Sequence, residues 1–89
     1  MLNSIILEGI VQIVNNRIIF IKSIHKTVSS VETIIIPCFL NEHFNIPNLN
    51  SKVRVVGRLK REENYLGIQV EHIEMAPIGS LNIEIDEIL

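Results

Sequence analysis

The chain has 89 residues, a net charge of −2 and an apolar fraction of 47%. A length of this order suits one domain with a small core, so we expect self-association to add to its stability. The net charge excludes a strongly basic nucleic-acid binder of the histone kind, because the affinity of such proteins depends on many cations. Cys38 is the only cysteine, which excludes a disulfide within the chain and suits a reducing cytoplasm.

No segment reaches the roughly 18 uninterrupted apolar residues of a membrane-spanning helix. The first residues also lack the cationic and apolar pattern of a signal peptide, so we expect a cytoplasmic protein without membrane contact. Cys38 and His43 are close in the sequence, but His25 and His72 are far from both. The spacing therefore predicts neither a metal site nor a cofactor.

Runs rich in Ile, Leu and Val, separated by turn signals, predict five strands. Asn15 and Asn16 mark a tight turn between the first two runs. Pro37 indicates a sheet edge or a bulge, because proline has no N–H to donate. Residues 41–50 form either a short helix or an irregular crossover. The expected strands are residues 4–14, 17–24, 31–40, 52–61 and 65–75.

Five strands with one irregular connection after the third predict an all-β fold, a five-stranded Greek-key barrel of the OB type, over residues 1–77. Gly9 and Gly57 fall inside strands, where glycine lets a tightly curved barrel strand bend. Residues 78–89 alternate apolar and acidic residues and form a short C-terminal extension. This extension either adds to a sheet edge, in its own dimer or on a partner, or acts as an acidic segment that competes with DNA for the basic face.

The fourth run alternates in a way that separates a core face from a charged face. Five of the eight cations lie within residues 52–61. Val53 and Val55 share one face with Gly57, and the cations lie mainly on the other. In the fifth run the apolar phase changes near Glu71 and His72, which predicts a β-bulge there.

Three segments resemble strands of bacterial single-stranded DNA-binding proteins. Residues 3–11 (Asn-Ser-Ile-Ile-Leu-Glu-Gly-Ile-Val) are similar to the opening strand of that family, Ile-Pro-Cys at 36–38 to its third strand, and residues 51–59 to its fourth. The resemblance extends over residues 3–75, and the short, tail-less form similar to primosomal replication protein B fits this length best.

The resemblance implies an OB barrel that binds single-stranded DNA in replication, repair or recombination. It also implies a homodimer or homotetramer, with replication proteins as further partners. The chain departs from the family in having no tryptophan, whereas the family often stacks bases on tryptophan. Because stacking contributes about 1–3 kcal/mol per base, we expect weaker binding than in a full-size member.

The cations of residues 52–61 are candidate phosphate ligands, because neutralisation of phosphates supplies most non-specific affinity for nucleic acid. The alternative is a solvated strand face on which they pair with nearby glutamates. Tyr65 and Phe39 are candidate stacking rings, but Tyr65 can equally cap the barrel and Phe39 can equally pack in the core. Two lysines around the second loop line one end of a groove or are ordinary loop cations. The candidate nucleic-acid-binding residues are Arg54, Arg58, Lys60, Arg61, Tyr65, Phe39, Lys22 and Lys26.

Phe20 lies inside an apolar strand and is expected in the core. Paired carboxylates, a nucleophile beside its base and a glycine-rich phosphate loop are all missing from the sequence, so we expect a binding protein and not an enzyme. The lead hypothesis is non-sequence-specific binding of single-stranded DNA. The alternative is an OB-fold protein-interaction module that has lost most DNA binding and docks on a replication partner, which the absent tryptophans and negative charge favour.

Overall fold

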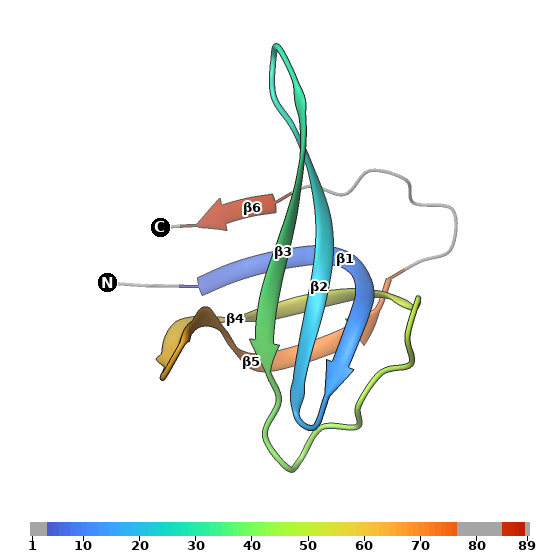
Figure 1. Cartoon of the computed structure of the whole chain (residues 1–89), viewed down its shortest axis with the longest axis vertical. Coiled ribbons are helices and arrows are strands. Elements are labelled where there is room, and N and C mark those ends of the chain that lie inside the picture. Colours follow the sequence, from blue (N-terminus) through green and yellow to red (C-terminus); the bar gives the residue numbers. More distant parts are fainter. Residues whose placement is uncertain (1–3, 77–84, 89) are drawn as a thin grey trace.

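A computed structural model describes residues 4–76 and 85–88 of the chain. Within these residues there is no helix, and five strands close into a barrel (Figure 1). This confirms the predicted all-β barrel of the OB kind. The strands are β1 (Ser4–Asn15), β2 (Ile18–Lys26), β3 (Val31–Phe39), β4 (Lys52–Glu62), β5 (Tyr65–Met75) and β6 (Ile85–Ile88).

The barrel closes because β1 pairs with two other strands of the barrel, β4 through its first half and β2 through its second half. The sheet order is β2-β3-β5-β4-β1-β6, and β1 pairs again with β2. Residues 4–10 of β1 pair with β4, and residues 10–15 pair with β2. The closing contact between β3 and β5 is parallel and joins only Cys38 and Phe39 to Ile68 and Gln69.

Gly9 and Gly57, the two glycines that the sequence analysis places inside strands, lie against the backbone of a neighbouring strand. A Cβ at Gly9 would meet the carbonyl oxygen of Lys22 on β2. A Cβ at Gly57 would meet the carbonyl oxygen of Gln69 and lie 2.7 Å from Cγ2 of Ile68. Both positions therefore exclude any larger residue unless the strands separate.

The predicted bulge in β5 is confirmed. Val56 pairs with His72, and the next β4 residue, Gly57, pairs with Val70, so Glu71 has no partner on β4. The extra residue moves the apolar phase of β5 to the opposite parity. Ile68 and Val70 are buried before the bulge, whereas Ile73 packs against the core after it.

The core is made almost entirely of aliphatic side chains from the inward positions of all five strands. The connection between β3 and β4 is irregular and contains no helix, which decides between the two alternatives for residues 41–50. Arg17 holds this connection in place: its Nε donates to the carbonyl of Leu40 (3.1 Å), and its Nη2 donates to the carbonyls of Asn41 (2.6 Å) and Phe44. The buried core residues are Leu7, Val11, Ile19, Ile21, Cys38, Leu40, Val53, Val55, Ile68 and Val70.

The C-terminal extension contributes a sixth strand to the same sheet. β6 pairs antiparallel with residues Ser4–Leu7 of β1, the half of β1 that β2 does not cover (Figure 1). Ile85–Ile88 therefore add to a sheet edge of their own chain. The expected domain boundary at residues 77 and 78 lies outside the described residues.

Candidate functional site

The cations of β4 lie on the outer face of the barrel, as the alternation predicts. Val53 and Val55 are fully buried, whereas Arg54 is partly exposed and Arg58 and Lys60 are exposed. We call the outer surface of β4, β5 and the first half of β1 the β4–β5 face. Its charged residues are Glu8, Lys52, Arg54, Arg58, Lys60, Glu62, Glu71, His72 and Glu74, and among its Lys and Arg side chains Lys52 alone makes no ion pair with another described residue.

Arg54 lies between two carboxylates from neighbouring strands. Glu8 of β1 and Glu74 of β5 are its direct partners in the strand registers. The Nη2 of Arg54 is 2.9 Å from Oε1 of Glu8, and its Nη1 is 3.4 Å from Oε1 of Glu74. The hydrogen bond with Glu8, followed by the charges of both carboxylates, raises the pKa of Arg54. The Glu8 side chain is only 15% exposed, and a largely buried carboxylate needs a charged partner. Arg54 therefore stabilises the fold by pairing with Glu8.

The next two cations of β4 are also paired. Nε of Arg58 is 3.2 Å from Oε2 of Glu71, and Nζ of Lys60 is 3.0 Å from Oε1 of Glu62. The β4–β5 face therefore has mixed charge, which favours the solvated, paired strand face over phosphate binding for these residues. Arg61 is exposed and makes no ion pair with another described residue.

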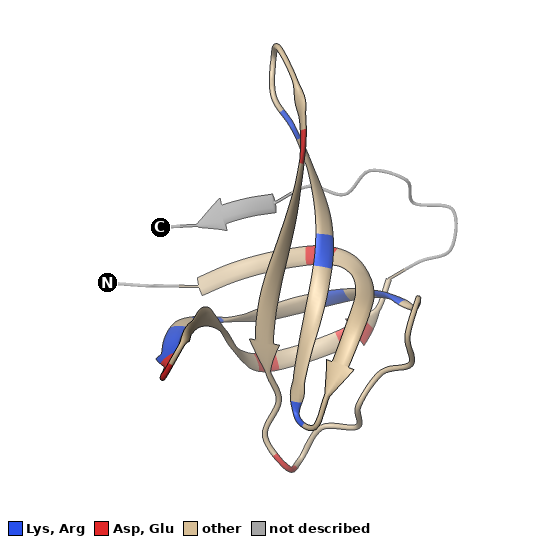
Figure 2. Ribbon diagram, viewed as in Figure 1, with Lys and Arg blue, Asp and Glu red and all other residues tan. Residues whose placement is uncertain are grey.

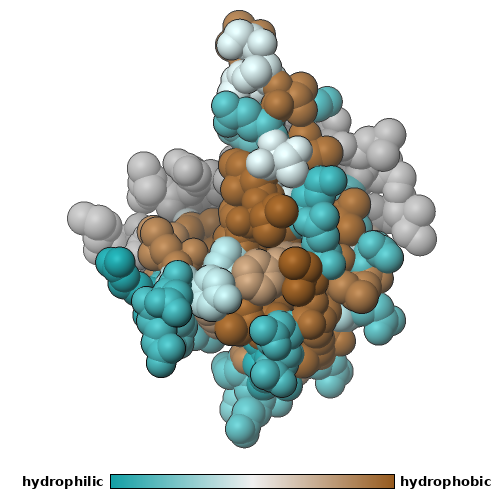
Figure 3. Space-filling model, viewed as in Figure 1, coloured by the Kyte–Doolittle hydropathy of each residue, from teal (hydrophilic) through white to brown (hydrophobic). Residues whose placement is uncertain are grey.

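The outer surface of β2 and β3 differs in its chemistry. Ile19, Ile21 and Ser23 are buried, so the alternate residues of β2 point away from the core. Their partners on β3 share the same surface, which we call the β2–β3 face. In Figure 3 hydrophobic side chains gather over the centre of this face. The outward residues are Ile18, Phe20, Lys22, Ile24 and Lys26 of β2 with Val31, Thr33, Ile35 and Pro37 of β3.

The β2–β3 face has cations and no carboxylates at its outward positions. Lys22 lies opposite Ile35, and Lys26 lies opposite Val31. Neither lysine forms an ion pair within the part of the chain that the structure describes. Glu32 is the only acidic residue of the two strands, and its partner His25 belongs to the opposite parity. Figure 2 shows the same contrast: basic residues lie along β4 beside the acidic residues of β5, but charges are few on β2 and β3.

An aromatic pair lies at the barrel end of this face. The ring centroids of Phe20 and Tyr65 are 5.8 Å apart, with an interplanar angle of 71°. Such an edge-to-face contact fixes both rings, and Tyr65 is 41% exposed. The expectation that Phe20 is a core residue was wrong: it is outward and partly exposed. Ile19 and Ile21 on either side of Phe20 point inward, and successive side chains of a strand point to opposite faces, so Phe20 must point outward.

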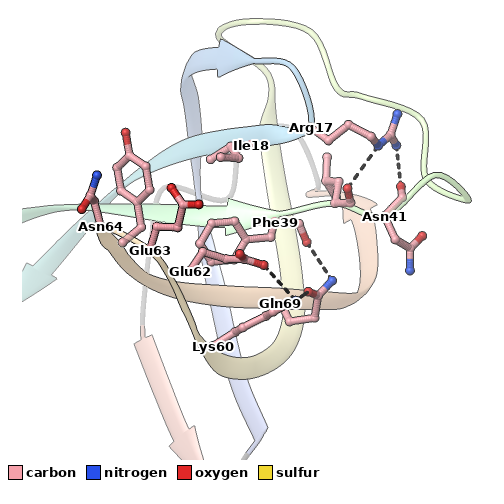
Figure 4. A pocket seen from close by; sticks show the side chains of 11 residues that line it. Arg17, Ile18, Phe39, Asn41, Lys60, Glu62, Glu63, Asn64 and Gln69 are labelled. Carbon is pink, nitrogen blue, oxygen red and sulfur yellow. Dashed lines mark hydrogen bonds and ion pairs between the residues drawn. The ribbon is translucent and has the colours of Figure 1, made fainter.

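A pocket of about 440 Å³ adjoins the β2–β3 face (Figure 4). It lies between the β1–β2 turn, the end of β3 and the β4–β5 hairpin. Lys60 crosses its floor and bonds to Gln69 Oε1 (3.0 Å), whose Nε2 donates to the carbonyl of Phe39 (3.2 Å). Phe39 lines the pocket but is only 6% exposed, so it offers little ring area for stacking. The lining residues are Arg17, Ile18, Phe39, Leu40, Asn41, Lys60, Glu62, Glu63, Asn64, Tyr65 and Gln69.

The structure thus divides the candidate residues into two groups. Lys22 and Lys26 lie on the β2–β3 face, and Tyr65 and Phe39 line the adjoining pocket. The second group, Arg54, Arg58 and Lys60, lies on the β4–β5 face with carboxylate partners, although Lys60 also lines the pocket. Arg61 belongs to neither group.

Among the described residues no three His, Cys, Asp or Glu side chains are grouped to hold a metal ion. The same residues contain no helix long and apolar enough to cross a membrane. The chain matches no protein-family model and no curated protein.

Proposed function

We propose that the chain binds single-stranded DNA without sequence preference and that the β2–β3 face, together with the ring of Tyr65, holds the strand. One observation supports this above all others. Lys22 and Lys26 share a face with the Phe20–Tyr65 pair, and no carboxylate shares its outward positions. Cations beside aromatic rings are what a sequence-tolerant single-strand site needs.

The spacing of the two lysines suits separate phosphates. They lie four residues apart on one side of β2, which corresponds to about 13 Å along a strand. Each ammonium would neutralise one phosphate and release its counterions. Tyr65, which is 41% exposed beside the β4–β5 turn, and the partly exposed Phe20 would supply ring surface for the bases. In this arrangement the chain binds and orients a strand and catalyses nothing.

The direct test is fluorescence anisotropy with a labelled oligo-dT at increasing salt. Two phosphate contacts predict that log K falls with log salt with a slope of about −1.4. Lys22→Glu is expected to weaken binding strongly. Arg58→Glu makes the same change of charge on the β4–β5 face and is expected to leave binding nearly unchanged. Absence of binding at low salt would exclude the proposal.

A second function, docking of a protein partner, is favoured by the aliphatic part of the same side of the barrel. Ile13, which pairs with Phe20, is 49% exposed, and Ile35 is 51% exposed. Apolar side chains in contact with each other on a surface are typical of protein interfaces. Under this alternative oligo-dT remains unbound, and the experiment above separates the two functions.

A further inference from the structure

The β2–β3 hairpin extends beyond the barrel as a two-stranded ribbon. β1 pairs with β2 only as far as Lys22, and β5 pairs with β3 only at Cys38 and Phe39. Beyond these points β2 and β3 pair solely with each other, up to Lys26 and Val31. In Figure 1 this ribbon projects from the top of the molecule.

One edge of that ribbon is open along β3. On the side of β3 away from β2, residues 31–36 form no backbone hydrogen bond or strand pairing with any other described residue. The comparable edge of β1 at Ser4–Leu7 is occupied by β6. An open strand edge presents unpaired N–H and C=O groups and readily accepts another strand.

The residues of the open edge do not protect it. Natural edge strands are commonly blocked by charges, by proline or by a bulge. Here residues 31–36 (Val-Glu-Thr-Ile-Ile-Ile) hold one charge, and Pro37 comes only after them. Val31 is 66% exposed and Ile35 is 51% exposed. A two-stranded ribbon is marginally stable alone. Pairing of this edge with a further strand would therefore stabilise the ribbon and bury its apolar side chains.

We propose that the β3 edges of two copies of this chain pair antiparallel about a two-fold axis and form a homodimer. A two-fold contact uses the same edge once in each copy, so it closes at two chains. A register centred on Ile34 places Thr33 opposite Ile35 of the second copy. The same register places Glu32 opposite Ile36 of the second copy, so the two carboxylates are not opposite each other.

The second copy suits this edge better than an unrelated strand for two reasons. The edge is nearly uncharged, so it brings no repulsion against itself. A chain of 89 residues with one small barrel also gains stability from burying further apolar surface. The pairing would place the β2–β3 faces of both copies side by side in one continuous sheet. It does not depend on DNA binding and is measured without DNA.

The first experiment measures the mass of the full chain by light scattering over a range of concentrations. The expected mass is twice the 10.1 kDa of one chain. Ile35→Lys places a cation on the edge of each copy and is expected to shift the population to the single-chain mass. Ile13→Lys is the matched control, because Ile13 has similar exposure on β1, and it should leave the dimer intact. Circular dichroism verifies that both variants are folded.

The second experiment tests the register by cross-linking. Thr33→Cys and Ile35→Cys variants, each also carrying Cys38→Ala, are mixed and oxidised. A disulfide-linked pair containing one chain of each kind supports the proposal. A single-chain mass at every concentration would overturn the proposal. A dimer that survives Ile35→Lys, or a mass above two chains, would also overturn it.

Discussion

The β4–β5 face and the β2–β3 face belong to one barrel, but the surroundings of their cations differ. On the first, Arg54 contacts carboxylates of both neighbouring strands, and Arg58 contacts Glu71 of β5. On the second, Lys22 and Lys26 lie among aliphatic and aromatic residues and have no carboxylate partner among the described residues. The number of cations on a strand is therefore a poor guide to binding, whereas the neighbours across the strand decide which cations remain available to an anion.

The largest expected effect tests the aromatic end of the β2–β3 face. Phe20→Ala removes both the ring and its contact with Tyr65. Base stacking is worth about 1–3 kcal/mol, so binding of oligo-dT should weaken between about 5-fold and about 160-fold. Leu66→Ala is a suitable control, because Leu66 is exposed on β5. Tyr65→Phe keeps a ring and should retain most of the affinity in the same anisotropy titration.

A smaller effect compares single cations on the two faces. Lys22→Gln should flatten the dependence of log K on log salt by about 0.7, the value for one phosphate contact with a single strand. Arg58→Gln should leave this slope unchanged, because Arg58 is already paired with Glu71. The measurement is a salt titration of oligo-dT binding for both variants. If only Arg58→Gln changes the slope, the assignment of the two faces is reversed.

The sequence predicted the strands well, because alternation and turn residues are local signals. Val53 and Val55 marked the core face of β4, and the change of phase near Glu71 marked the bulge that the structure contains. The partners of Arg54 could not be predicted in this way. Glu8 lies 46 residues away in the sequence, and only the pairing of β1 with β4 brings it opposite Arg54.

The candidate site was predicted only in part, because contacts between residues far apart in the sequence are not visible in local patterns. Lys22 and Tyr65 were named from their places beside loops, but their common location depends on how β2 and the β4–β5 hairpin meet. The ring of Phe20 was misassigned to the core because an apolar run hides which residues point outward. The alternate burial of Ile19 and Ile21 settles this, and it follows from a period of two. Arg17 was overlooked, since its carbonyl partners are more than 20 residues away.

The third prediction concerns the structural task of the β4–β5 face. Arg54→Met leaves the carboxylate of Glu8 largely buried and without its hydrogen-bonding partner. We expect the melting temperature to fall, because an unpaired carboxylate in that position is unfavourable. Oligo-dT affinity at a temperature where both proteins are folded should not change. The double variant Glu8→Gln, Arg54→Met should recover part of the lost stability in thermal unfolding.

The smallest expected effect is a dependence of stability on pH that arises from Cys38 in the core of the barrel. Burial raises the pKa of the Cys38 thiol to about 12 from an ordinary value of 9.0. The unfolded chain therefore loses this proton at lower pH than the folded chain, and stability falls as pH rises from about 9 towards 12. At pH 9.5 the loss amounts to about 1 kcal/mol relative to neutral pH.

The matched experiment is urea unfolding at pH 7.5 and pH 9.5 for the natural chain and for Cys38→Ala. The difference between the two pH values should be smaller in Cys38→Ala by that amount, although its stability at pH 7.5 is lower because of the cavity. Equal pH dependence in the two proteins would mean that the thiol is accessible to water. Cys38 points inward opposite Ile19, so its substitution should leave the response of oligo-dT binding to salt as it is. That outcome would separate the stability of the barrel from the chemistry of the β2–β3 face.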